Sequence, residues 1–222
     1  MKTVYRIITP IISIAIFPVL YFLPLLRVMI SSGLNTGDTK TNLLTTLTGL
    51  KDYISINDVV KLTGNDDNKL SLFKQLWGNL NEETKQKMLG EFSCGKFLIA
   101  AAVFLALFIL LMLAVMFVSA ICRNHLPALC ISAGALISLF AANGCFKAFA
   151  KPFLSGAIGV SSIINGLTKE PNSTISTLSS LLGNLASVDM LQLSIAYSAC
   201  ILITVAVIIF TLSAMVEEKY SK

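Results

Sequence analysis

Charged residues are scarce in this chain, and that scarcity excludes most soluble folds. Of its 222 residues, 13% are charged and 55% are apolar, and the mean hydropathy is +0.78. A soluble domain carries about 25% charged residues. The composition therefore predicts a membrane protein whose first partner is the lipid bilayer.

The residues from which active sites are built are also scarce. The only histidine, His125, falls in a predicted turn, where a solvated side chain is the usual state. No His/Cys pair has the spacing of zinc ligands, and no glycine-rich phosphate-binding motif occurs. The predicted spans contain no Asp or Glu, which excludes a carboxylate proton relay. We therefore predict no enzymatic activity, no cofactor, no metal site and no nucleic-acid partner.

Long apolar runs are what the sequence has in abundance. Four of them, near residues 7–30, 97–121, 126–149 and 193–216, reach the roughly 20 residues that cross about 30 Å of hydrocarbon. Only helices and closed barrels satisfy the backbone in lipid, so we expect helices. The predicted fold class is an all-α polytopic membrane protein with four transmembrane helices and a small helical extracytoplasmic cap.

The first run raises the question of a cleaved signal peptide. Lys2 and Arg6 precede it, as in a signal peptide. However, the run exceeds the 7–15 apolar residues of a cleavable signal, and no small-residue cleavage site follows. We therefore favour a retained signal anchor over a cleaved peptide. Prolines 10, 18 and 24 predict kinks near Thr9, Phe17 and Leu23.

The connections divide the chain into five segments. The short connection 122–127 makes the second and third spans an antiparallel hairpin, so both long connections lie on the other side. The predicted segments are a first transmembrane helix (1–30), an extracytoplasmic helical loop (31–96), the hairpin (97–149), a second extracytoplasmic amphipathic segment (150–192), and a fourth helix with a short cytoplasmic tail (193–222).

Basic residues indicate the orientation, because they favour cytoplasmic flanks. The margin is narrow, but two basic residues precede the first helix and Arg27 alone follows it. We predict a multi-pass protein of the plasma membrane with both termini cytoplasmic. The inner flanks then hold Lys2, Arg6, Arg123, Lys219 and Lys222, and the outer flanks hold Arg27, Lys96, Lys147 and Lys151.

Those four outer residues admit two interpretations. Basic side chains at span ends usually extend to lipid phosphates as end markers. The alternative is a basic collar, formed by Arg27, Lys96, Lys147 and Lys151, that binds an anionic ligand or lipid headgroup. Net charge, +5 in total, does not separate them.

The long connections show helical periodicity. Leucines 43, 44, 47 and 50 recur at the 3.6-residue spacing of one helix face, and leucines 178, 181, 182 and 185 do the same. No β-branched alternation is evident, so we predict helices rather than a β-domain. Residues 44–62 also align without gaps with residues 175–193, which is either a true duplication or a chance match of leucine-rich helices.

Small residues on the spans predict close helix packing. Gly134, Ser138 and Ala142 recur every four residues on the third run, and Ala196 and Cys200 do so on the fourth. Small residues at this spacing let membrane helices approach closely. Asn143 is the strong hydrogen-bonding residue of the third run and should face protein, either within the chain or in another subunit.

Two further sets of residues have open roles. Phe73, Leu76 and Trp77 form an apolar cluster that could be the cap core, a membrane-interface anchor or a partner site. The five cysteines are either small apolar fillers or include an outer disulfide, Cys145–Cys200 or Cys94–Cys145.

The sequence is compatible with two functions. The first is an accessory or assembly subunit that binds another membrane protein, or a second copy of itself, through the outer cap and the small-residue helix faces. The alternative is a small transporter or channel component that acts alone or as an oligomer. The layout is similar to that of claudin-like proteins, but Leu76–Trp77–Gly78 is not followed by paired cysteines, so no family is assigned.

Overall fold

A computed structural model describes residues 2–32, 52–57, 86, 90, 93–122, 125–156 and 186–220. The chain divides into two compact units. We call the first the helical unit; it comprises Met1–Leu23, Ile99–Cys145 and Ile195–Lys222. We call the second the sheet unit; it comprises Pro24–Leu98 and Phe146–Ser194. Each unit is described by itself.

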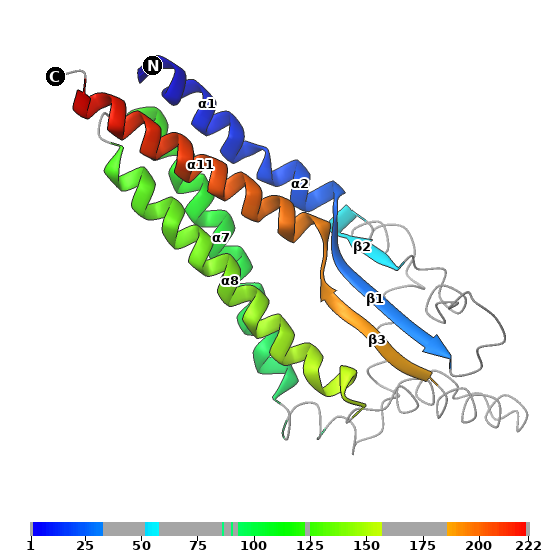
Figure 1. The fold of residues 1–222 in the computed structure, drawn as a ribbon. Coiled ribbons are helices and arrows are strands. Elements are labelled where there is room, and N and C mark those ends of the chain that lie inside the picture. The colour runs from blue at the N-terminus through cyan, green and yellow to red at the C-terminus, as the bar shows by residue number, and fades with distance from the viewer. Residues whose placement is uncertain are drawn as a thin grey trace, which may run out of the picture. The chain divides into compact units, whose positions relative to one another are not determined.

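Helices dominate the described residues (Figure 1). They are α1 (Lys2–Ile14), α2 (Ile16–Phe22), α7 (Cys94–Ile121), α8 (Leu126–Leu154) and α11 (Ile195–Tyr220). Three segments are long and apolar enough to cross a membrane: Cys94–Ile121, Leu126–Leu154 and Ile195–Glu217. The first apolar run contains a shorter apolar helix, Ile7–Phe22. The prediction of a mostly helical membrane protein agrees with this architecture.

Proline explains how the first apolar run is interrupted. The break between α1 and α2 falls at Ala15, whose backbone N–H is shared between the carbonyls of Ile11 and Ile12, each at 3.2 Å. Pro18 cannot donate to the carbonyl of Ile14, and its ring crowds that carbonyl. The kink predicted near Phe17 is therefore a break slightly earlier, whereas α1 continues through Pro10.

The prediction that the first helix reaches residue 30 is wrong. Helix α2 ends at Phe22, and residues Pro24–Ser32 form strand β1. The intervening Leu23 is extended, with φ −81° and ψ 148°. A residue before proline is sterically excluded from the helical region, so Pro24 ends the helix instead of kinking it.

The prediction of an entirely helical cap is also wrong. Strand β1 lies between β2 (Tyr53–Ser55) and β3 (Ala186–Leu193) in an antiparallel sheet of order β2-β1-β3. Figure 1 shows β1 and β3 side by side along most of their length. The register pairs Leu26 with Leu193 and Val28 with Leu191, and a bulge follows in which Asp189 is the extra residue. Residues 186–192, predicted within the amphipathic segment, therefore belong to a strand, as does Leu193, which was predicted to begin the fourth membrane helix.

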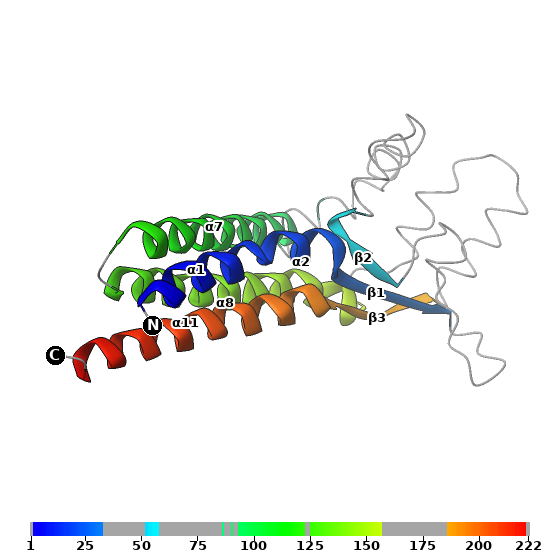
Figure 2. The same cartoon turned by 90° about the horizontal axis from the view of Figure 1, so that it is seen from above.

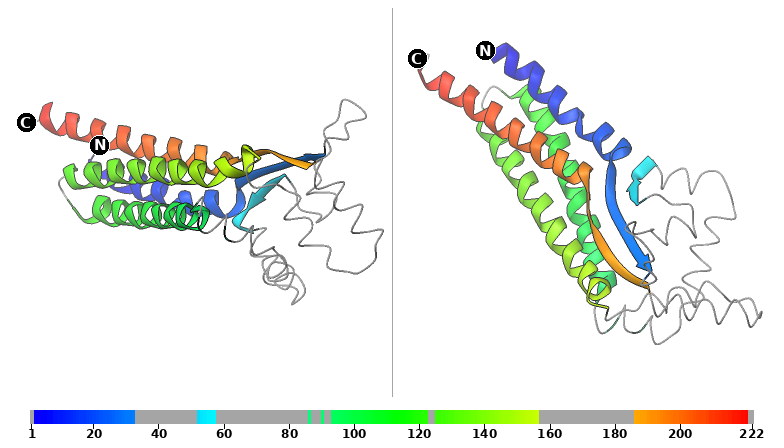
Figure 3. Two further views of the ribbon diagram at one scale, coloured as in Figure 1. Left: turned by 90° about the horizontal axis from the view of Figure 1, so that it is seen from below. Right: turned by 45° about the vertical axis from the view of Figure 1, so that its right-hand side comes forward.

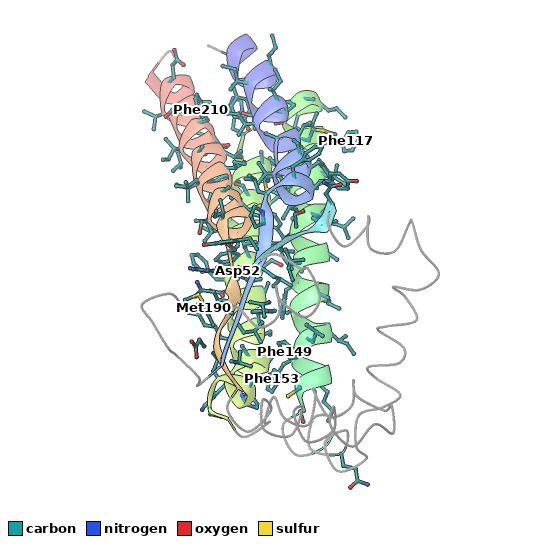
Figure 4. All side chains as sticks on the ribbon, turned by 90° about the vertical axis from the view of Figure 1, so that its right-hand side faces the viewer. Asp52, Phe117, Phe149, Phe153, Met190 and Phe210 are labelled. Carbon is teal, nitrogen blue, oxygen red and sulfur yellow. The ribbon has the colours of Figure 1, made fainter. Side chains whose placement is uncertain are left out.

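One face of this sheet packs on helix ends within the sheet unit. Cys94, at the start of α7, and Phe153, near the end of α8, are buried with exposed fractions of 2% and 8%. Phe149, Val188 and Leu191 pack against them. The rings of Phe149 and Phe153, labelled in Figure 4, have centroids 5.3 Å apart. We call these five residues the sheet-unit core.

Helix α8 is longer than one membrane crossing requires. Its 29 residues rise roughly 43 Å, which exceeds a hydrocarbon thickness of about 30 Å.

The helical unit is a helix bundle (Figures 2 and 3). Helices α1 and α2 run along α11, and α7 runs beside α8. Large apolar side chains such as Ile99, Ile137 and Leu202 are exposed on the outside of the bundle. An apolar exterior of this kind suits contact with lipid.

Candidate functional site

Polar side chains are concentrated on one face of α1. Tyr5, Thr9 and Ser13 follow each other at four-residue steps and have exposed fractions of 4%, 0% and 2%. Residues four apart lie above one another on a helix, so the three form a continuous inward stripe. The stripe was not predicted, because the three residues lie within a predominantly apolar run of the sequence.

Tyr5 joins three elements at one end of the bundle. Its ring meets the ring of His125 edge-on, with centroids 4.3 Å apart and planes at 75°. Its hydroxyl lies 3.5 Å from the hydroxyl oxygen of Thr211 on α11. The same side chain therefore contacts α11 and the residue that precedes α8.

The prediction that His125 is solvated is wrong. Its exposed fraction is 2%. The carbonyl of His125 accepts a hydrogen bond of 3.1 Å from the backbone N–H of Leu129, so the residue caps the N-terminus of α8. This position fixes the backbone beside α1, and the imidazole packs on Tyr5 instead of pointing into water.

Most buried hydroxyls of the helical unit are hydrogen-bonded. Thr204 donates to the carbonyl of Cys200 at 2.7 Å, and Thr211 donates to the carbonyl of Val207 at 2.7 Å. By contrast, the hydroxyls of Thr9 and Ser13 and both ring nitrogens of His125 are buried with no hydrogen-bond partner among the described residues. A buried unpartnered polar atom costs about 1–3 kcal/mol.

We call Tyr5, Thr9, Ser13, His125 and Thr211 the polar seam. It offers hydroxyl groups and one imidazole, which donate and accept hydrogen bonds, and it holds no carboxylate. In the part of the chain that the structure describes, no three His, Cys, Asp or Glu side chains cluster as metal ligands. The chemistry of the seam therefore suits a small neutral polar molecule.

The residues predicted for helix packing lie largely inside the bundle. Ser138, Ala142, Ala196 and Cys200 are all buried. The hydroxyl of Ser138 donates to the carbonyl of Phe104 at 2.7 Å, which links α8 to α7. Asn143 and Gly134 are half-buried on α8. A Cβ on Gly134 would lie 3.8 Å from the Leu111 side chain, so α8 and α7 approach to van der Waals contact there.

The four predicted collar residues all belong to the sheet unit. Lys96, Lys147 and Lys151 are exposed on α7 and α8. Arg27 differs, because it is half-buried on β1 with its guanidinium carbon 4.9 Å from the centre of the Tyr53 ring. Arg27 therefore takes part in a cation–π contact within the sheet.

The five cysteines were predicted to be either small apolar fillers or, in part, an outer disulfide. All five cysteines, each of which the structure describes, are free thiols, so neither predicted disulfide is present. Phe73, Leu76 and Trp77 lie outside the described residues, as does most of the aligned pair of segments 44–62 and 175–193.

No protein-family model matches the chain, and neither the curated proteins nor the solved structures yield a significant match.

Proposed function

We propose that the chain spans the plasma membrane four times, with both termini in the cytoplasm. The added span is α1 with α2. From Lys2 to Phe22 a rise of 1.5 Å per residue extends roughly 30 Å, enough to cross the hydrocarbon. Ile7, Ile11 and Ile14 are exposed on its outer side, as lipid contact requires. The sheet unit then lies on the extracytoplasmic side.

Cysteine labelling tests this topology. In a variant whose five native cysteines are replaced, Asp66→Cys and Arg123→Cys are introduced one at a time. A membrane-impermeant thiol reagent added outside intact cells is expected to label the first variant and not the second. Labelling of both positions from one side contradicts the four-span arrangement.

We propose that the protein is an accessory or assembly subunit that binds another membrane protein. The observation that carries this proposal is the uncharged interior of the helical unit. Among the described residues, the buried polar side chains are those of Ser, Thr and His125, and none is an Asp, Glu, Lys or Arg. Intramembrane charges commonly mark ion and substrate pathways, so this interior favours a structural role.

The packing within the chain suggests which surface meets the partner. Four of the small residues predicted for helix packing, Ser138, Ala142, Ala196 and Cys200, are buried within the chain itself. The sheet unit offers an alternative surface: Gln192 is exposed on β3, at the end of the sheet nearest to α11 in the chain. We therefore propose that partner contact lies in the sheet unit.

Photocrosslinking and purification in mild detergent test the subunit hypothesis together. A photoreactive residue at Gln192 is expected to give a discrete protein adduct, and the matched position Ile137, exposed on the outside of α8, is expected to give lipid adducts. A larger membrane protein should co-purify in stoichiometric amount. Protein adducts from Ile137 and none from Gln192 would move the contact to the helices.

The transport alternative has one specific observation in its favour. The polar seam carries unpartnered hydrogen-bonding atoms inside a membrane bundle, and intramembrane polar groups often line solute paths. Solute flux from the pure protein in liposomes, together with no co-purifying protein, would support transport over assembly.

A further inference from the structure

Five buried polar atoms of the helical unit have no hydrogen-bond partner among the described residues. One is the hydroxyl of Tyr197, and the other four belong to the polar seam: Oγ1 of Thr9, Oγ of Ser13, and Nδ1 and Nε2 of His125. Thr9 and Ser13 continue the α1 stripe that begins at Tyr5, and Tyr5 contacts the His125 ring.

The neighbouring hydroxyls show that this arrangement is not a general property of the bundle. Thr204, Thr211 and Ser132 each donate to a carbonyl of their own helix at 2.7–2.9 Å. A helical Ser or Thr can satisfy its hydroxyl in this way at almost any position. Thr9 and Ser13 do not, although both side chains are buried.

We propose that the polar seam binds ordered water, which bridges the hydroxyls of Thr9 and Ser13 and the imidazole of His125. A buried water typically makes about three hydrogen bonds to groups that the protein leaves unsatisfied. Because all four atoms are buried, bulk water does not reach them, and ordered water is the partner that can satisfy them.

The chemistry of the seam favours water over other ligands. A cation would need compensating negative charge or many carbonyl ligands, because an unpaired charge in the interior is very costly. The seam provides hydroxyls and a single imidazole. An apolar ligand would leave all four atoms unsatisfied. Water both donates and accepts, so it can serve the hydroxyls and either ring nitrogen of His125.

His125 makes the proposal testable because the chain contains one histidine. Protein labelled with ¹³C,¹⁵N-histidine in lipid bilayers gives ring signals from this residue alone. Magnetisation transferred from water to the carbon-bound ring protons is expected to appear at short mixing times. Absence of transfer in the unaltered protein means a dry seam and overturns the proposal.

Substitutions identify which groups hold the water. Thr9→Val keeps the side-chain shape and removes the hydroxyl, so it is expected to slow the transfer to His125 several-fold. The matched control is Thr204→Val on α11, whose hydroxyl bonds its own helix and whose loss should leave the transfer unchanged. Unchanged transfer in Thr9→Val overturns the bridge.

Two further variants separate hydration from misfolding. Thr9→Ser retains the hydroxyl and is expected to restore the rapid transfer. Ser13→Ala removes the second hydroxyl and provides an independent test if Thr9→Val does not fold. The melting temperature of the variants provides a separate test. Removing a dry, unpartnered hydroxyl should raise the melting temperature, whereas removing a hydroxyl that binds water should lower it. A raised melting temperature for both variants overturns the proposal.

Discussion

Phe153→Ala is expected to lower the free energy of unfolding of the sheet unit by about 3–5 kcal/mol, the usual cost of truncating a buried aromatic side chain. Phe153 is buried against Cys94, and the two are joined by Phe149, Val188 and Leu191. Removing the ring leaves a cavity between the end of α8 and strand β3. In the proposed topology the sheet unit lies outside the hydrocarbon, so the surface exposed on unfolding meets water and the full hydrophobic cost applies.

The thiol of Cys94 provides a local measurement. In a variant that keeps only this cysteine, Phe153→Ala should accelerate its reaction with a thiol reagent and lower the unfolding midpoint. The neighbouring Leu154→Ala is the matched control, since Leu154 is 46% exposed and should cost little. Equal reactivity of Cys94 in both variants would mean that Phe153 does not close this core.

The long membrane helices were predictable because a single property, sustained hydropathy, determines them. The run 97–121 lies within α7, and the run 126–149 lies within α8. Their ends were less predictable. Helix α7 begins at Cys94, and α8 continues to Leu154, because these turns pack on the sheet and do not depend on lipid for burial.

The strands were missed for a different physical reason. A short apolar run is compatible with a buried strand or with a helix, and periodicity alone does not separate them. The stretch Pro24–Ser32 therefore merged with the preceding span, although Pro24 itself was a local sign that the helix ends. The partner of β1 is Ala186–Leu193, and no local property of either segment predicts a pairing so distant in sequence.

The polar seam was only half predictable. The four-residue spacing of Tyr5, Thr9 and Ser13 is visible in the sequence and marks one helix face. The burial of His125 was not visible, because it depends on α1 lying beside the start of α8. A turn residue is normally exposed, and only the contact with Tyr5 reverses that expectation.

Tyr5→Ala is expected to destabilise the helical unit by about 2–4 kcal/mol, somewhat less than in an aqueous core, because lipid replaces water around the separated helices. The loss comes from packing. Tyr5 is buried between His125 and Thr211, so its removal opens a cavity where α1 meets α11 and the start of α8.

Tyr5→Phe separates the ring from the hydroxyl. The oxygen-to-oxygen distance to Thr211 is 3.5 Å, which is long for a hydroxyl hydrogen bond, so this change should cost less than about 1 kcal/mol. Ile7→Ala is the control on the same helix, because Ile7 is 56% exposed and faces outward. Reversible unfolding in bicelles measures all three variants, and the ring signals of His125 report the local packing. If Tyr5→Phe costs as much as Tyr5→Ala, then the hydroxyl, and not the aromatic contact with His125, holds this end of the bundle together.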